Sequence, residues 1–193
     1  MAELDEQYLI SRCQQQNDRQ AFNELVIRYQ DRIFNTVYRI VNDHPTAADI
    51  CQESFLKAYQ SINGFKSQSS FLTWLYQIAV NLCYNYKRGQ KRFSALPDND
   101  LLSGTANSEA TPRGGQNQSG NPASAIEDRE QTFLIQQALD SLDKELRTIV
   151  VLKDIDGCSY EEISKVLKCS IGSTRAKLCK ARLLLKDKLA RLI

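Results

Sequence analysis

Apolar residues recur every three or four positions in segment after segment of this chain, and hardly any stretch alternates apolar with polar residues. The clearest stripe runs through Phe22, Leu25, Tyr29, Ile33 and Val37. Such spacings place side chains on one face of an α-helix, whereas a strand needs a period of two. The sequence therefore predicts an all-α fold.

A segment of different composition, residues 94–128, interrupts this pattern. It contains three prolines, four glycines and many Ser, Asn and Gln residues, and it has no aromatic residue. This composition cannot bury much apolar surface and is typical of a flexible linker. We therefore expect two small helical domains, residues 1–93 and 129–193, joined by a flexible linker.

Helix starts in the N-terminal domain are indicated by short polar residues. A short helix is expected around 5–16, and a longer one should end at His44–Pro45 because proline disfavours the helical conformation before it. Thr46 followed by Asp49 predicts a capping box for the next helix.

The C-terminal domain carries a second capping-box pattern, Ser159 and Glu162. The short amphipathic helix that it begins is followed by a turn and by a longer helix from Ile171. This arrangement is the outline of a helix-turn-helix, whose second helix enters the major groove of DNA. The alternative is an αα-hairpin with a solvated basic face.

The net charge is only +2, but residues 64–93 carry +5 with no Asp or Glu, and residues 160–193 carry +6. Two basic blocks separated by acidic stretches indicate two contacts with one polyanion. Two solvated basic faces without a shared partner would give the same pattern. Charge alone does not decide between these interpretations.

The first basic block combines residue types that suit unpaired bases. Away from the apolar stripe, the helix that begins near Ser70 presents Gln77, Asn81, Tyr84 and Arg88. Amides read base edges, an exposed aromatic ring stacks on bases and arginine neutralises phosphates. The alternative is a helix whose polar face is solvated and has no binding role. Trp74 falls on the apolar stripe and is expected to belong to the core, with contact to DNA as the alternative.

Three runs resemble bacterial sigma factors. The run DICQESFLKAY (49–59) resembles the segment that binds core RNA polymerase, and FLTWLYQIAVN (71–81) resembles the promoter-melting segment. The runs DGCSYEEI (156–163) and GSTR (172–175) resemble the family's helix-turn-helix. Two domains and no others match the small extracytoplasmic-function group.

The resemblance implies site residues and partners. Residues that dock on core RNA polymerase would be Asp49, Gln52 and Glu53. Those at the minus-ten element, chiefly on its single-stranded non-template strand, would be Lys66, Ser69, Ser70, Phe71, Gln77, Asn81, Tyr84 and Arg88. Duplex DNA at the minus-thirty-five element would be read by Ser173, Arg175, Lys177, Lys180 and Arg182. An anti-sigma factor is a further expected partner.

Several positions depart from the family pattern. Asp143 stands where proline is usual, and we expect it to cap the next helix instead. Ala176 and Lys177 replace a serine and an arginine of the recognition helix, so the preferred promoter sequence stays open.

No enzyme is expected, because clustered carboxylates, a phosphate loop and a nucleophile–base pair are all missing from the sequence. The six cysteines and His44 lack the spacing of metal sites, so neither metal nor other cofactor is predicted, and the cysteines are interpreted as small buried hydrophobes.

No apolar run is long enough for direct membrane insertion, which together with the N-terminal sequence predicts a cytoplasmic protein.

The predicted function is that of a sigma factor, which directs core polymerase to promoters and assists their melting. The alternative is a helix-turn-helix transcription regulator that does not bind core polymerase. The sequence leaves open the target genes, the promoter sequence, the inducing stress, the identity of any anti-sigma factor and the redox activity of the cysteines.

Overall fold

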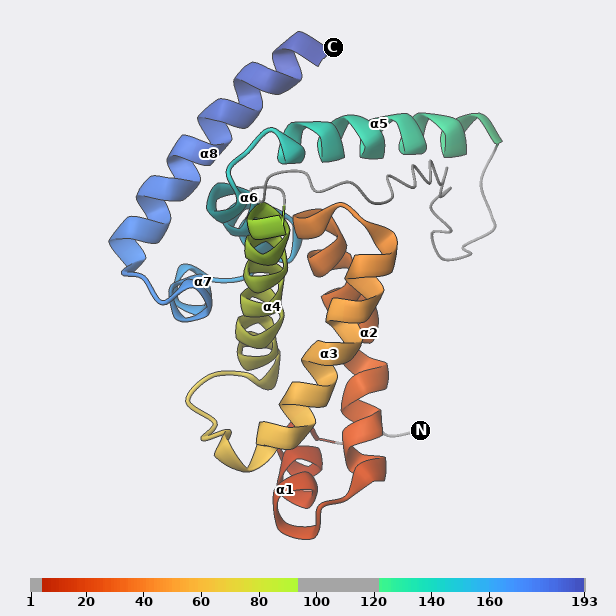
Figure 1. Cartoon of the computed structure of the whole chain (residues 1–193), viewed down its shortest axis with the longest axis vertical. Coiled ribbons are helices and arrows are strands. Elements are labelled where there is room, and N and C mark those ends of the chain that lie inside the picture. Colours follow the sequence, from red (N-terminus) through yellow and green to blue (C-terminus); the bar gives the residue numbers. More distant parts are fainter. Residues whose placement is uncertain (1–4, 94–121, 193) are drawn as a thin grey trace.

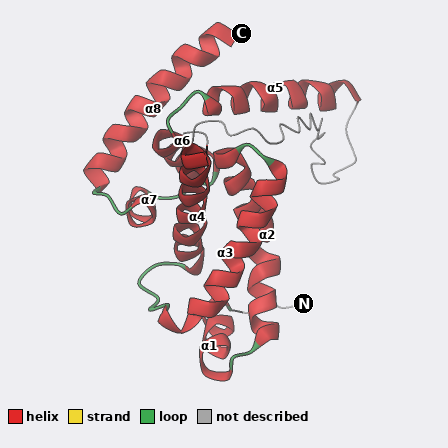
Figure 2. Ribbon diagram, viewed as in Figure 1, coloured by secondary structure: helices red, strands yellow, loops and turns green. Residues whose placement is uncertain are grey.

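The computed structural model describes residues 5–93 and 122–192, and in these ranges every regular element is helical (Figures 1 and 2). The N-terminal domain consists of α1 (Glu6–Gln16), α2 (Arg19–Val41), α3 (His44–Ser61), the 3₁₀ turn η1 (Ile62–Gly64) and α4 (Phe71–Phe93). The C-terminal domain consists of α5 (Pro122–Asp140), α6 (Lys144–Val150), the π-helical turn η2 (Val151–Ile155), α7 (Tyr160–Leu167) and α8 (Ile171–Leu192). The prediction of two helical domains is confirmed.

The start of α3 differs from the prediction. The Asp43 carboxylate accepts the Thr46 N–H at 2.9 Å, so Asp43 is the N-cap and Thr46 lies inside the helix. Pro45 fits the first turn because a proline has no N–H, and N–H groups there have no partner within the helix. The capping box predicted at Thr46 and Asp49 is therefore wrong, and α3 begins before Pro45 rather than after it.

The starts of α7 and α6 test two further capping predictions. The box at Ser159 and Glu162 is confirmed: the Glu162 N–H donates to Ser159 Oγ at 3.1 Å, and the Ser159 N–H donates to Glu162 Oε2 at 2.8 Å. Asp143 does occupy the N-cap of α6, but its side chain makes no capping hydrogen bond.

The predicted linker, 94–128, overlaps the start of α5. Its last residues, 122–128, belong to α5, which begins at Pro122. Proline is favoured in the first turn of a helix, and the Ala, Glu and Arg residues that follow are good helix formers. The remainder of the predicted linker lies outside the described residues.

The N-terminal domain packs α2, α3 and α4 around a core in which Leu25, Ile33 and Leu75 are fully buried. In the C-terminal domain, Ile163 of α7 and Leu178 and Ala181 of α8 are buried together with α6. Leu25 and Ile33 belong to the apolar stripe described from the sequence, and the others are apolar residues of the same helical spacing in their own helices. The stripes are therefore the faces by which the helices assemble.

The two domains also pack against one another. Figure 1 shows α7 beside α4, and α5 across the end at which α2 stops. At that end the guanidinium of Arg147, a buried side chain on α6, donates to the Ile40 carbonyl of α2 at 2.8 Å. The last carbonyls of a helix have no partner within it and form its negative end, so a cation is favourable there. The C-terminal domain thus completes the hydrogen bonding of α2.

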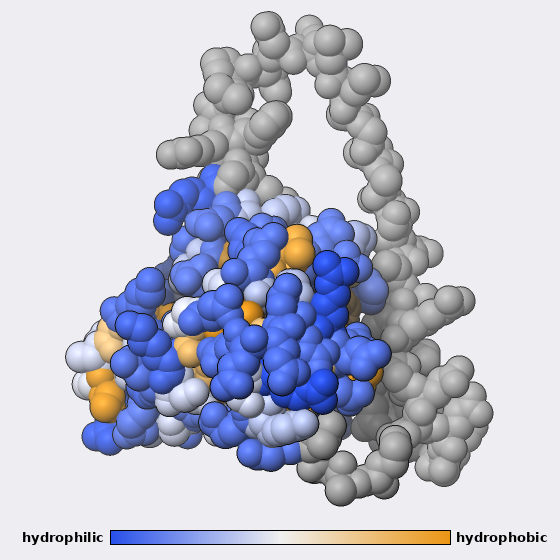
Figure 3. Space-filling view, turned by 90° about the horizontal axis from the view of Figure 1, so that it is seen from below, coloured by the Kyte–Doolittle hydropathy of each residue, from blue (hydrophilic) through white to orange (hydrophobic). Residues whose placement is uncertain are grey.

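The surface in Figure 3 is largely hydrophilic, with small hydrophobic spots between charged and polar residues. None of the helices described is long and apolar enough to cross a membrane.

Candidate nucleic-acid and polymerase interfaces

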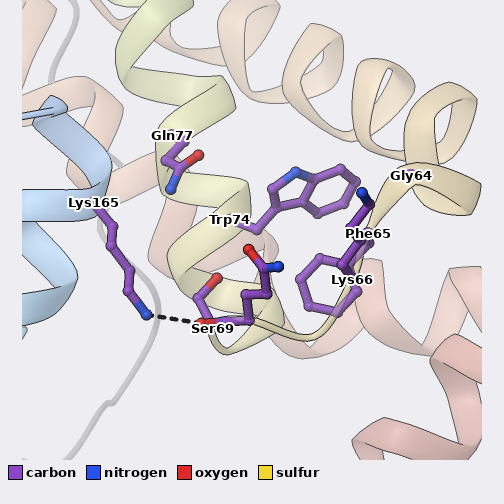
Figure 4. Close-up of a pocket in the computed structure, with 8 residues that line it drawn as sticks. Gly64, Phe65, Lys66, Ser69, Trp74, Gln77 and Lys165 are labelled. Carbon is purple, nitrogen blue, oxygen red and sulfur yellow. Dashed lines mark hydrogen bonds between the residues drawn. The ribbon is translucent and has the colours of Figure 1, made fainter.

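A hollow of about 340 Å³ lies at the start of α4, where the loop 66–70 folds back beside the helix. Figure 4 shows the Trp74 ring along one side of it, Gln77 above and Ser69 on the loop below. The residues that line the hollow are Gly64, Phe65, Lys66, Gln68, Ser69, Trp74, Gln77 and Lys165. It therefore combines an aromatic surface, amides, a hydroxyl and two ammonium groups, all groups that can recognise a nucleotide.

The hollow has a rigid aromatic wall. The Trp74 ring lies 5.1 Å from the ring of Phe65 and 5.7 Å from that of Phe71, measured between ring centres. Phe65 and Phe71 are buried, whereas Trp74 is only half-buried. Trp74 is thus both part of the core and part of the lining, so the two interpretations of this residue from the sequence do not exclude one another.

Six of the eight residues predicted for the minus-ten element lie where DNA could reach them. Lys66 and Ser69 line the hollow together with Gln77, and Ser70 is exposed at the start of α4. The Ser70 hydroxyl accepts the Thr73 N–H at 3.1 Å and so satisfies one free donor of the first turn. Further along α4, Asn81 and Arg88 are exposed.

Phe71 and Tyr84 differ from their predictions. Phe71 is 0% exposed, so it cannot contact DNA directly and instead supports the Trp74 ring. Tyr84 is half-buried, with the Lys144 ammonium of α6 4.8 Å from its ring centre, and burial raises its pKa to about 12. Its ring faces the other domain because residue 84 lies where the apolar stripe of α4 borders α6. In this arrangement Tyr84 is not an exposed stacking platform.

The residues predicted to bind polymerase are all exposed on α3. Asp49 and Glu53 border a second hollow, between α3 and α4, which Leu82 and Tyr86 also line. Glu53 forms an ion pair with Lys57 at 2.9 Å, one turn further along the helix. Gln52 is exposed on α3 outside the residues of that hollow. The arrangement is a helix face with two carboxylates beside a hollow of mixed polar and apolar lining.

The predicted recognition helix, α8, exposes Arg175, Lys180 and Arg182. Arg175 lies over the Tyr160 ring at 5.2 Å from its centre, and the Arg182 Nε donates to Asp154 Oδ2 at 3.2 Å. Of the other predicted residues, Ser173 is half-buried at the start of the helix, and Lys177 forms an ion pair with Glu145 of α6. Several of the basic groups therefore have acidic or aromatic neighbours within the domain.

Residues from the C-terminal domain reach the start of α4 and the hollow beside it, which sequence reasoning missed. The Lys165 ammonium of α7 donates to the Gln68 carbonyl at 2.8 Å, the contact drawn as a dashed line in Figure 4. The Thr73 hydroxyl donates to Glu162 Oε1 at 3.0 Å. Neither contact leaves a local sequence signal, because the partners are about ninety positions apart along the chain.

A polar cluster around Asp156 forms the centre of the domain interface. Thr36 donates to the Asp156 carboxylate at 2.7 Å, and the Arg32 Nε donates to the Tyr76 hydroxyl at 2.9 Å. Arg32 also donates to the Asp156 backbone carbonyl. Burial raises the pKa of the Asp156 carboxyl, and the Thr36 hydrogen bond and the Arg32 charge oppose that shift. The cluster was not predicted from the sequence.

The cysteines are mostly buried, as interpreted from the sequence: Cys13, Cys51, Cys83 and Cys158 are inaccessible, Cys169 is half-buried and Cys179 is exposed. Burial raises the pKa of the Cys158 thiol to about 12. Among the residues that the structure describes, no three His, Cys, Asp or Glu side chains gather as metal ligands would.

A helical domain with a basic nucleotide-sized hollow, followed by a helix-turn-helix, defines a two-domain DNA-binding protein of transcription. Two family models match the chain: sigma-70 region 2 over residues 25–93 and sigma-70 region 4 over residues 132–185. The chain is 36% identical over 193 residues to the ECF RNA polymerase sigma-E factors of Salmonella typhimurium and Escherichia coli, covering 99% of this chain and 97% of theirs. The chain belongs to the ECF group of sigma factors, as its motifs predicted.

Solved structures support the same fold. CnrH in complex with the cytosolic domain of CnrY matches with a TM-score of 0.69 at 20% identity, over 97% of this chain and 99% of that one. The sigma factor RpoE from Bartonella quintana, in complex with the anti-sigma factor NepR, matches with a TM-score of 0.65 at 19% identity, over 88% of this chain and 96% of that one.

Proposed function

We propose that this sigma factor recognises promoters through three separate surfaces. The face of α3 that bears Asp49 and Glu53 docks on core polymerase. The hollow at the start of α4 receives an unpaired base of the minus-ten element, and α8 lies in the major groove at the minus-thirty-five element. The observation that carries the proposal is the hollow itself, because an aromatic wall beside amides and ammonium groups suits a base taken out of its stack.

Promoter opening on this proposal needs no catalytic group in the sigma factor. Stacking on Trp74 and hydrogen bonds from Gln77 repay part of the free energy of unstacking the base, while Lys66 neutralises phosphate. Core polymerase performs the chemistry, so we infer a non-enzymatic protein that works in the cytoplasm, where its polymerase and DNA are. A helix-turn-helix regulator without polymerase contact is disfavoured, because the region 2 match extends over the polymerase-binding face.

An anti-sigma factor is a further expected partner. RpoE of Bartonella quintana is described in complex with the anti-sigma factor NepR. By family resemblance we propose that a protein of this kind restrains the present chain by holding both domains.

The proposal is tested by run-off transcription with core polymerase and the variant Gln77→Ala. We expect a loss of about ten-fold on closed duplex promoters, because a base-contacting amide contributes roughly 1–3 kcal/mol. The loss should be much smaller on templates already unpaired across the start site. Asn23→Ala, the same chemical change on the exposed face of α2, serves as the control. An equal loss on both templates would assign Gln77 to another step.

A further inference from the structure

None of the described residues that line the minus-ten hollow comes from α1, yet this helix holds the backbone from which the hollow is built. Figure 1 shows α1 beside the turn that follows α3. The half-buried side chain of Gln14 lies at this contact, and its Nε2 donates to the carbonyls of Ile62 and Phe65, each at 2.9 Å. A side-chain amide has two N–H donors, so Gln14 uses both of them on one turn.

The turn that Gln14 holds is the 3₁₀ turn η1, which the Phe65 N–H closes by donating to the Ile62 carbonyl at 3.0 Å. The Ile62 carbonyl therefore accepts one hydrogen bond from the turn and one from α1. A 3₁₀ turn has poorer hydrogen-bond geometry than an α-helix, so a contact from a neighbouring helix helps to define it. The chain leaves the turn at Phe65 in an extended conformation and enters the loop 66–70.

Two parts of the hollow depend on the position of Phe65. The backbone continues from Phe65 directly into Lys66, and Gln68 and Ser69 follow in the lining. The Phe65 ring lies behind the half-buried Trp74, 5.1 Å away between ring centres, and Figure 4 shows the two rings together. A displacement of the Phe65 carbonyl would therefore move both the loop and the support of the aromatic wall.

α1 supports the aromatic wall at a second point, near its start. The Tyr29 hydroxyl of α2 donates to the Glu6 carboxylate. The Tyr29 ring centre lies 5.9 Å from that of Phe71, which in turn supports Trp74. Burial and the Glu6 hydrogen bond raise the pKa of the Tyr29 hydroxyl to about 12, so at neutral pH it is protonated and can donate. Both ends of α1 are thus connected to residues behind Trp74.

Choosing among bases requires more precise positioning than binding the DNA backbone does. The ammonium group of Lys66 is a point charge on a flexible stem, so it can follow a phosphate that is slightly displaced. A hydrogen bond from the Gln77 amide to a base edge weakens steeply when its length or angle departs from the ideal. The loop and the aromatic wall must therefore hold the base at one distance from Gln77.

We propose that Gln14 is a positioning residue for base selection in the minus-ten hollow. By fixing the carbonyls of Ile62 and Phe65, it sets the loop 66–70 opposite Gln77 and keeps the aromatic wall in place. The inference rests on the proposed function of the hollow. It adds to the determinants of promoter preference a residue of α1 that does not itself touch the base.

The experiment measures run-off transcription by holoenzyme on duplex templates in which each position of the minus-ten element carries each of the four bases. Gln14→Met removes both donors but keeps the length of the side chain, and Gln14→Glu removes them while keeping its shape. Gln15→Met is the matched control, because Gln15 is exposed and adjacent on the same helix. The templates derive from a promoter that the unaltered holoenzyme transcribes.

We expect Gln14→Met and Gln14→Glu to reduce the preference at one minus-ten position by roughly three- to ten-fold, part of the discrimination that one good contact to a base edge supplies. The preferences at the minus-thirty-five element should not change, and Gln15→Met should change none. A merely structural Gln14 would instead lower transcription from all templates by the same factor. That result, or an unchanged preference in Gln14→Glu, would overturn the proposal.

The fluorescence of Trp74, the sole tryptophan, gives a second measurement on the free chain. Acrylamide should quench it more strongly in Gln14→Met than in Gln15→Met, because a displaced Phe65 ring leaves the indole less covered. Both chains are compared at a temperature at which circular dichroism shows them to be folded. Equal quenching would overturn the connection from Gln14 to the aromatic wall.

Gln77→Ala in the same transcription assay separates this proposal from the proposed function of the hollow. If Gln77→Ala changes the preference at one minus-ten position and Gln14→Met changes none, the hollow binds the base and the positioning role of Gln14 is wrong. If neither variant changes a minus-ten preference, the proposed function of the hollow fails as well. A change at the same position in both variants supports both proposals.

Discussion

The two basic surfaces of this protein have similar charge in the sequence but are built differently. The first surrounds a hollow with an aromatic wall, and a second domain covers part of it. The second is the outer side of α8, where Arg175, Lys180 and Arg182 are exposed. A hollow suits an unpaired base, whereas an exposed helix suits the major groove. A basic block in the sequence thus indicates a polyanion without indicating the form in which it is bound.

The largest expected effect tests whether the domains fold as one unit. Arg147→Met should lower the free energy of unfolding by about 2–4 kcal/mol, because it removes the hydrogen bonds that the buried guanidinium donates to the carbonyls of Ile40, Leu139 and Asp140. Urea unfolding followed by circular dichroism measures this. Arg175→Met, on the exposed side of α8, is the control. A loss confined to the unfolding of the C-terminal domain would show that the interface adds little to stability.

The second prediction concerns the face of α3 that bears Asp49 and Glu53, which belongs to neither of the two basic surfaces. Glu53→Lys should weaken binding to core polymerase by about 1–3 kcal/mol, because it reverses a charge on the docking face and breaks the pair with Lys57. Glu24→Lys makes the same change on the exposed side of α2. A competition assay against a labelled sigma factor gives both affinities. Equal affinities would remove α3 from the polymerase interface.

The third prediction separates base reading from phosphate binding on α8. Lys180→Ala should lose about 1–3 kcal/mol on the preferred minus-thirty-five sequence and relax the preference at one base position. Arg182→Ala should weaken all sequences similarly and lower the salt slope by about one. Binding to all single-base variants at two salt concentrations measures both.

The pair with Asp154 makes Arg182 informative, because DNA must compete with that carboxylate. If Arg182→Ala changes the base preference and Lys180→Ala does not, α8 is rotated in the groove from the position proposed. The contrast between the two surfaces would remain, but the reading residues would change.

The smallest expected effect concerns α7, the helix that lies between the hollow and α8. Ser159→Ala should destabilise the protein by about 1 kcal/mol, the usual effect of losing an N-cap. Thermal unfolding measures it, with Ser164→Ala, later on the same helix, as the control. An unchanged midpoint of thermal unfolding would mean that the Ser159 cap adds nothing measurable to the stability of α7.

The helices and the stripes that pack them followed from the sequence, because both depend on residues three or four positions apart. The Ser159 box and the helix-turn-helix are of this kind, and so is the position of Gln77 and Asn81 on the open side of α4. The wrong start of α3 has a local cause as well. Asp43 and Thr46 are both good capping residues, and the helix used the one that let Pro45 enter its first turn.

The tertiary structure alone decided how the domains meet. Arg147 binds the end of α2, Asp156 binds Thr36, and Glu162 binds Thr73, although each pair is separated by about ninety residues or more. Periodicity shows which side of a helix is apolar, but it does not show which distant polar group will satisfy a buried carboxylate or guanidinium. Periodicity placed Tyr84 on the open side of α4, whereas in the structure its ring faces the other domain. The family resemblance placed Phe71 at the DNA, whereas its side chain is buried in the core, in agreement with its position on an apolar stripe.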